Sequence, residues 1–151
     1  MAGGAHFKPL HLDVAVRLAL TAAETGHLVL ATLHTSSAAK SIDRIIDVFP
    51  GDEKDMVRSM LSESLSAVVS QILLKTKTGD DRIAAHEIML GTPAIRNLIR
   101  EGKVAQMVSV MQTSAGVGMQ TLDHCLGDLL RKELITAETA RAASRTPGQF
   151  L

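Results

Sequence analysis

A short, almost continuously apolar run, His27–Thr35 (HLVLATLHT), constrains the fold more than any other segment of this chain. Gly26 precedes the run and Ser36 follows it, so it has the length of a single strand. A strand that is apolar on both faces is typical of a parallel sheet covered on both sides. The flanking segments, Asp13–Glu24 and Ala38–Val48, carry apolar residues at helical spacing. This order of helix, strand and helix predicts an α/β fold.

The ends of these two helices carry residues that suit helix boundaries. Asp13 can cap the first helix, and Gly26 can end it. Ser36 or Ser37 can cap the second helix, which we expect to end before Pro50. The sequence thus predicts both bounds of each helix that flanks the strand.

A hairpin is expected in the middle of the chain. Apolar residues at helical spacing fill Glu53–Lys75, which predicts a long amphipathic helix whose end runs into a strand. Lys75–Arg82 (KTKTGDDR) has the composition of a turn, and Ile83–Leu90 has that of a strand. We therefore expect a hairpin with its turn around Gly79 and Asp80.

The chain becomes helical after Gly91. Pro93 suits the first turn of a helix, and Thr92 can cap that helix. Four short helices are expected, at Ala94–Glu101, Val104–Thr113, Leu122–Glu133 and Ala137–Ser144. The predicted organisation is an irregular N-terminus over residues 1–13, an α/β core over 14–91 and a helical subdomain over 92–151.

Composition and spacing exclude several kinds of partner. Sixteen Lys and Arg balance sixteen Asp and Glu, so we expect no nucleic acid as a partner. No apolar run is long enough to cross a bilayer, so we expect no membrane insertion. Cys125 is the only cysteine, so it cannot form an internal disulfide, which fits a reducing cytoplasm. We expect it to be a buried core residue. His86 and Glu87 do not continue into His-Glu-x-x-His, and no other ligand spacing occurs, so we expect no metal.

Two histidines lie at the ends of the predicted strand. Ligands of open α/β sheets bind beyond the carboxyl ends of parallel strands, where His34 and Thr35 would lie. His27 would lie at the start of the strand. Each histidine has a second interpretation, as a polar residue at a strand end with no role in binding.

Two arginines lie one turn apart in Ala94–Glu101 (AIRNLIRE). We expect its apolar residues to pack inward and Arg96 and Arg100 to point outward. Such a pair is either a patch for an acidic partner or an ordinary solvated face.

Several stretches of the sequence are similar to known motor proteins. The segment TAAETGHLVLATLHTSSAAKSIDRIIDVFP resembles the secretion and pilus motor ATPases. MVRSMLSESL, AAHEIMLGTPAIRNLIREGKVAQM and GMQTLD resemble the PilT-type twitching-motility ATPases, which retract type IV pili. The resemblance covers about Val16 to Phe150, and AIRNLIRE is the motif most specific to the retraction type.

This resemblance implies a partial RecA-like domain of the P-loop NTPase superfamily, with a parallel sheet remnant and a β-hairpin, followed by a small helical bundle. It implies hexamers that bind ATP and Mg²⁺ between the two domains of each subunit. Within a histidine box, His34 and His27 would be catalytic, and Thr32 and Thr35 would bind nucleotide. The implied retraction motif comprises Ala94, Ile95, Arg96, Asn97, Leu98, Ile99, Arg100 and Glu101.

The resemblance also implies partners. These are other pilus ATPase subunits, in a homo- or hetero-hexamer, and an inner-membrane pilus platform protein. The implied location is cytoplasmic, at the inner face of the cytoplasmic membrane.

Two motifs of these ATPases are missing from the 151 residues. The phosphate-binding motif G-x-x-x-x-G-K-[ST] does not occur. Aligned back from Arg17, the positions of the Walker B region hold His11, Leu12, Val14 and Ala15. Phosphoryl transfer needs phosphate-cradling amides, a lysine, Mg²⁺ and an acidic residue that positions water. We therefore expect this chain alone to bind neither ATP nor Mg²⁺ and to be inactive as an ATPase.

Several interpretations of function follow. The leading one is a C-terminal fragment of a retraction ATPase, either a truncated or frameshifted product or a short paralogue. A second is a non-catalytic assembly module that joins hexamers of a full-length paralogue. A third is a fragment of a type II secretion-type ATPase, which AIRNLIRE disfavours. A fourth is a DNA-binding helical module, which the balanced charge disfavours.

Overall fold

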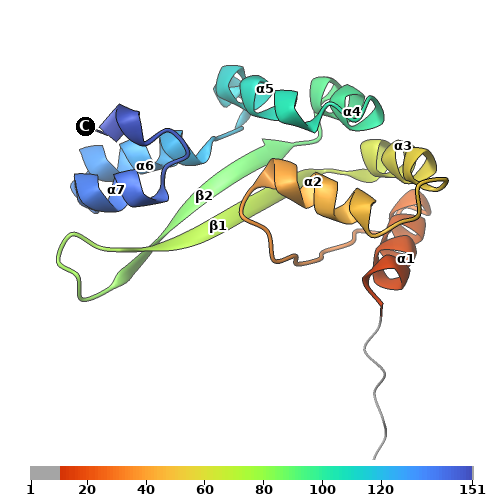
Figure 1. The fold of residues 1–151 in the computed structure, drawn as a ribbon, viewed down its shortest axis with the longest axis horizontal. Coiled ribbons are helices and arrows are strands. Elements are labelled where there is room, and N and C mark those ends of the chain that lie inside the picture. The colour runs from red at the N-terminus through yellow and green to blue at the C-terminus, as the bar shows by residue number, and fades with distance from the viewer. Residues whose placement is uncertain (1–10, 151) are drawn as a thin grey trace, which may run out of the picture.

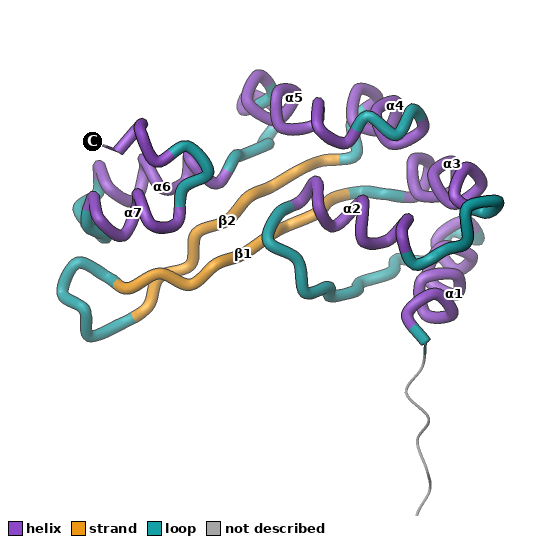
Figure 2. Tube along the Cα trace, in the orientation of Figure 1, coloured by secondary structure: helices purple, strands orange, loops and turns teal. Residues whose placement is uncertain are grey.

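The computed structural model describes residues 11–150, which form a β-hairpin packed against helices (Figures 1 and 2). The strands are β1 (Ala67–Lys75) and β2 (Arg82–Leu90). The α-helices are α1 (Leu12–Glu24), α2 (Ala38–Asp47), α3 (Lys54–Ser64), α4 (Pro93–Arg100), α5 (Met107–Thr113), α6 (Leu122–Arg131) and α7 (Ala137–Ala143). The 3₁₀ helices are η1 (Val104–Gln106), η2 (Ala115–Val117) and η3 (Pro147–Phe150).

The hairpin is confirmed. β1 and β2 pair antiparallel along their whole length, from Ala67 opposite Leu90 to Lys75 opposite Arg82. The turn between them contains Gly79, whose φ of +82° lies in the left-handed region that favours glycine.

The long helix expected over Glu53–Lys75 is wrong in its second half, which forms a strand. α3 ends at Ser64, and the apolar residues after it alternate in β1 instead. Residues such as Val68 and Ile72 fit both helical spacing and strand alternation, and the pairing with β2 decides between them. Gly91 permits the backbone just after β2 to lie against the carbonyl oxygen of Leu65 just before β1, because a Cβ there would collide with that oxygen.

The expected parallel strand over His27–Thr35 is wrong. Residues 27–35, which we call the histidine segment, have no strand pairing and run as a connection between α1 and α2 (Figure 1). Leu28 and Leu30 are 83% and 87% exposed. A buried parallel strand needs hydrogen-bonded neighbours. Within residues 11–150 the only sheet is the antiparallel pair of β1 and β2, to which Gln120 adds an isolated bridge at Ile88. The α/β class and the hairpin followed by helices are as expected.

A side-chain cap is present at the start of α2 but not at the start of α1. α1 begins at Leu12 with His11 at its N-cap, so the cap expected at Asp13 is wrong. Asp13 lies in the first turn, where a negative charge favours the helix. Gly26, with φ of +90°, follows the end of α1 as expected. Ser37 caps α2, because its Oγ accepts a hydrogen bond of 3.0 Å from the amide of Lys40.

The four C-terminal helices are confirmed within a few residues of their expected bounds. None of the helices in the described range 11–150 combines the length and hydropathy that crossing a membrane requires.

One face of the hairpin carries both hydrophobic cores. Met89 contributes to a core shared with α1–α5, whereas Ala85 and Leu74 contribute to a core shared with α6, α7 and η3. Residues that alternate along a strand share a face, so Glu87 lies between Ala85 and Met89 on this same inward face. It is only 2% exposed, although it is acidic. A buried carboxylate therefore separates the two cores.

Candidate functional site

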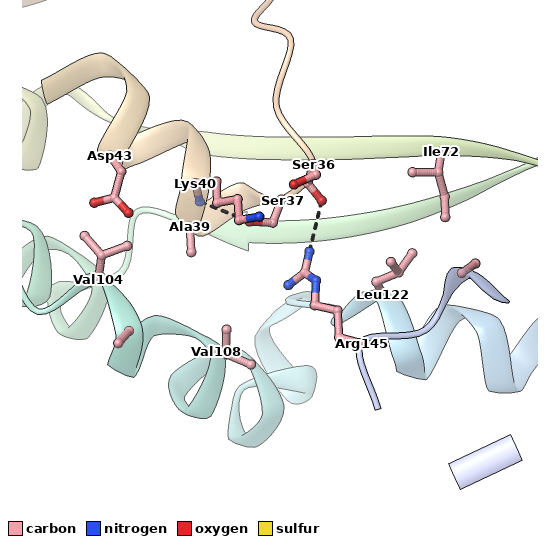
Figure 3. A pocket seen from close by; sticks show the side chains of 12 residues that line it. Ser36, Ser37, Ala39, Lys40, Asp43, Ile72, Val104, Val108, Leu122 and Arg145 are labelled. Carbon is pink, nitrogen blue, oxygen red and sulfur yellow. Dashed lines mark hydrogen bonds between the residues drawn. The ribbon is translucent and has the colours of Figure 1, made fainter. Parts of the chain in front are cut away.

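The start of α2 borders an open pocket of about 650 Å³ (Figure 3). Its polar wall comes from Ser36, Ser37, Lys40 and Asp43 on one side and Arg145 on the other. Its apolar wall comes from β1 and the C-terminal helices, through Ile72, Val104, Ala105, Val108, Leu122 and Ala143. The pocket therefore lies where the segment that leads into α2 meets the C-terminal end of the chain.

The buried carboxylate of Glu87 links these two parts of the chain. Its Oε1 accepts a hydrogen bond of 2.7 Å from the amide of Ala38, the first residue of α2. Its Oε2 lies 2.8 Å from the guanidinium of Arg145. Arg145 also donates to the carbonyl oxygen of Ser36, at 3.2 Å. The buried negative charge is thus paired and hydrogen-bonded, as burial requires.

Hydroxyl groups form further hydrogen bonds at the start of α2. The Oγ of Ser41 donates to the carbonyl oxygen of Ser37 at 3.0 Å. The hydroxyl of Thr35 lies 2.6 Å from the same Oγ. Since the single proton of Ser41 is already donated, Thr35 is the donor in that contact. Thr35 is therefore fixed to α2 by its side chain.

The two histidines of the histidine segment are exposed. Nδ1 of His27 lies 3.0 Å from the hydroxyl of Thr25. Within the described range, no hydrogen bond is found for the ring of His34, and Thr32 is exposed as well. The pocket begins at Ser36, so the structure keeps all three residues in one segment without bringing them into the pocket. Their roles toward a nucleotide stay predictions.

The residues around the pocket do not by themselves fit a nucleotide. The Glu87 carboxylate and the Ser37 hydroxyl already occupy donors at the start of α2, where a phosphate would otherwise bind. A negative carboxylate there repels a phosphate rather than attracting one. Among residues 11–150, no three His, Cys, Asp or Glu side chains gather as a metal site requires.

One carboxylate anchors the start of the segment that follows α7. Residues 144–150, which we call the C-terminal strap, follow α7. Asp123 of α6 accepts hydrogen bonds from the Ser144 hydroxyl at 2.8 Å, from the Arg145 amide at 3.1 Å and from the Thr146 hydroxyl. Burial works to raise the pKa of Asp123, but these hydrogen bonds outweigh it, so the pKa lies below its ordinary value.

Asp123→Ala should lower the free energy of unfolding by about 1–3 kcal/mol at neutral pH, because three donors lose a charged acceptor. The folded state lowers the pKa of Asp123, so its contribution is complete above the ordinary value of 3.8 and is lost as pH falls through the lower folded pKa. Urea denaturation of the unsubstituted chain and of Asp123→Ala should therefore give free energies of unfolding that converge in strong acid. Asp128→Ala is the control on the same helix, because its partners Arg131 and His124 are both exposed. A stability difference that stays constant with pH would contradict this role for Asp123.

Arg96 does not point outward as expected. It is half-buried, and its Nε donates to the carbonyl oxygen of Gly91 at 2.6 Å. Its terminal nitrogens donate to the carbonyl oxygens of Ser62 at 3.0 Å, of Leu65 at 3.2 Å and of Glu63. Carbonyls at the end of a helix lack partners within the helix. Arg96 therefore caps the end of α3 from α4, which helical periodicity alone could not show.

The rest of α4 follows the sequence pattern more closely. Ile95, Leu98 and Ile99 are buried, as expected. Arg100 is exposed, and its guanidinium donates to the Ser62 hydroxyl at 3.4 Å. Pro93 occupies the first turn and Thr92 the N-cap position, as expected, but the side chain of Thr92 makes no capping hydrogen bond.

Sequence reasoning missed Glu87, Arg145 and Asp123. One signal was available for Glu87: it is an acidic residue at an inward position of a strand whose alternate neighbours are apolar. Such a residue needs a buried partner. No local pattern identifies that partner, because Arg145 lies far away in the sequence.

Comparison with known proteins gives a consistent result. Residues 13–104 match the family model described as "Type II/IV secretion system protein". The chain is 67% identical to the type IV pilus retraction ATPase PilT of Pseudomonas aeruginosa over 135 residues, which are 89% of this chain and 39% of that protein. It is 63% identical to a twitching motility protein of Neisseria gonorrhoeae over 126 residues, which are 83% of this chain and 34% of that protein.

The fold is also similar to a solved structure. A crystal structure of the pilus retraction motor PilT with bound ADP superimposes with a TM-score of 0.79 and 44% identity. The match covers 90% of this chain and 38% of that one. The chain thus spans less than two fifths of the length of these relatives.

Proposed function

This chain belongs to the family of type II/IV secretion system proteins, and from that premise we propose that it serves as the C-terminal part of a type IV pilus retraction ATPase. The observation that carries the proposal is the high identity to two pilus retraction and twitching proteins over nearly the whole chain. The 135 matched residues span the segment with AIRNLIRE, the motif that the resemblance ties most closely to retraction rather than to type II secretion.

We propose that the complete ATPase of which this chain would be a part acts within a homo- or hetero-hexamer of pilus ATPase subunits. ATP and Mg²⁺ would be held mainly by the part of such a protein that this chain does not span. His34 would contact the nucleotide from the exposed histidine segment, with His27, Thr32 and Thr35 beside it. The exposure of His34 supports this role, because its ring is accessible to a ligand held elsewhere.

The retraction motif takes two roles in this proposal. Its apolar residues and Arg96 stabilise the fold, as their contacts indicate. The exposed side chains of Asn97, Arg100 and Glu101 are then the ones available to an inner-membrane pilus platform protein. That contact would place the assembly at the inner face of the cytoplasmic membrane.

The purified 151-residue chain should hydrolyse ATP no faster than buffer, because it has no phosphate-cradling loop and no catalytic lysine. Release of inorganic phosphate from ATP and Mg²⁺ measures this directly. His34→Ala should show the same absence of turnover. Turnover above background that disappears in His34→Ala would contradict the proposal that this chain is inactive alone.

A second candidate function is a non-catalytic assembly module. It is favoured by the exposed side chains of Leu28 and Leu30, which are apolar and suit burial against another chain. Mixing the chain with the retraction ATPase PilT of P. aeruginosa separates the two functions. Stable co-purification as a mixed oligomer supports the module, and its absence favours the fragment.

A further inference from the structure

The contacts around Glu87 join three parts of the chain that are distant in sequence. Glu87 belongs to β2, Ala38 begins α2, and Arg145 belongs to the C-terminal strap. Arg145 reaches the carbonyl oxygen of Ser36 across 109 positions of the sequence. Figure 3 shows this contact between two of the residues that line the pocket. The carboxylate and the guanidinium together hold backbone groups on both sides of Ser37.

We propose that Glu87 and Arg145 form a latch through which the C-terminal strap fixes the junction between the histidine segment and α2. Arg145 is then a positioning residue. It holds the carbonyl of Ser36, the residue that directly follows the histidine segment, while Glu87 holds the amide of Ala38.

Burial and charge explain why the latch depends on both residues. The side chain of Glu87 is 3% exposed and that of Arg145 is 36% exposed. Without Arg145, the buried carboxylate keeps a single backbone donor and remains an uncompensated charge. Without Glu87, Arg145 loses its carboxylate partner, and its contact to Ser36 is a single hydrogen bond at the surface.

The histidine segment has few other attachments near its C-terminal end. Thr35 contacts Ser41 through its hydroxyl, whereas His34 and Thr32 are exposed. The position of Ser36 therefore determines how the C-terminal end of the histidine segment is placed relative to α2. A role in directing His34 toward a nucleotide rests on the proposed function above, but the latch itself needs no nucleotide.

The strap is itself well anchored, which the latch requires. Asp123 holds Ser144, Arg145 and Thr146, and Phe150 is buried in the core of α6 and α7. Arg145 therefore lies in a segment that is anchored on both sides of its contacts to Glu87 and Ser36.

Native-state hydrogen exchange on the 151-residue chain, without nucleotide, tests the latch. In Arg145→Met, the amides of Ala38 and Ser41 should exchange about tenfold faster, which corresponds to about 1.4 kcal/mol of local protection. Amides of α3 and α4 should keep their rates. Arg145→Lys should restore part of the protection, because a lysine still places a cation near Glu87. Arg141→Met, which removes the same charge from an exposed position of α7, should leave all rates unchanged.

Two further results decide the matter. The double variant Glu87→Gln/Arg145→Met should exchange no faster at Ala38 than Glu87→Gln alone, because both changes open the same latch. Rates at Ala38 and Ser41 that match the unsubstituted chain in Arg145→Met would overturn the latch. So would a uniform acceleration in every helix, which signals general destabilisation. Because no nucleotide is present, a failed nucleotide role for His34 would not alter these rates.

Discussion

Arg96→Ala should lower the free energy of unfolding of this chain by about 2–4 kcal/mol, since one hydrogen bond to a charged group contributes about 1.5–3 kcal/mol. The substitution removes donors from the carbonyls of Ser62, Glu63, Leu65 and Gly91 at once. Water replaces some of these donors, because Arg96 is only half-buried, and this limits the loss. Urea denaturation followed by circular dichroism measures the change.

Two variants separate capping by Arg96 from its charge. Arg96→Lys keeps the charge but replaces the planar fork with one ammonium group, so it should recover only part of the stability. Arg100→Ala removes an exposed arginine one turn away and should change stability by less than about 0.5 kcal/mol. An Arg96→Ala protein as stable as Arg100→Ala would show that the contacts to α3 do not contribute.

Leu98→Ala should destabilise the chain by about 2–5 kcal/mol, because truncation of a buried leucine loses apolar burial and leaves a cavity. Leu98 is 9% exposed and belongs to the core shared by α1–α5. Thermal and urea unfolding both measure the effect. Asn97→Ala, at the exposed neighbouring position, is the matched control and should change little. A Leu98→Ala protein with the stability of Asn97→Ala would contradict the packing of α4.

These two predictions change how variants in AIRNLIRE are to be interpreted. A substitution at Arg96 or Leu98 lowers the stability of the fold whether or not it also affects a partner contact. Loss of retraction in such a variant is therefore informative only beside a measurement of stability. Arg100 and Asn97 are better probes of partner contact, because their side chains are exposed.

Local sequence signals predicted the elements that local chemistry determines. The Ser37 cap of α2, the turn at Gly79 and the short C-terminal helices all depend on neighbouring residues. The boundary between α3 and β1 was missed, because Val68 and Ile72 satisfy both periodicities. Only pairing with β2, which is a non-local contact, decides that segment.

Non-local contacts also explain the errors at the candidate site. The apolar run His27–Thr35 predicts a strand, but a strand forms only beside a hydrogen-bonding neighbour. Arg96 was expected outward because its helical position is opposite the apolar residues, yet its long side chain reaches back to α3. The pairing of Glu87 with Arg145 depends on how the whole chain folds, which spacing does not encode.

A chimera tests the central proposal most directly. Residues 16–150 of this chain would replace the matching part of the P. aeruginosa retraction ATPase PilT, in a strain that lacks its own copy. If this chain is the C-terminal part of a retraction ATPase, the chimera restores twitching motility, measured as the diameter of the twitching zone, and its His34→Ala variant does not. A chimera that folds, hydrolyses ATP and leaves the cells with surface pili but without twitching would contradict the proposal.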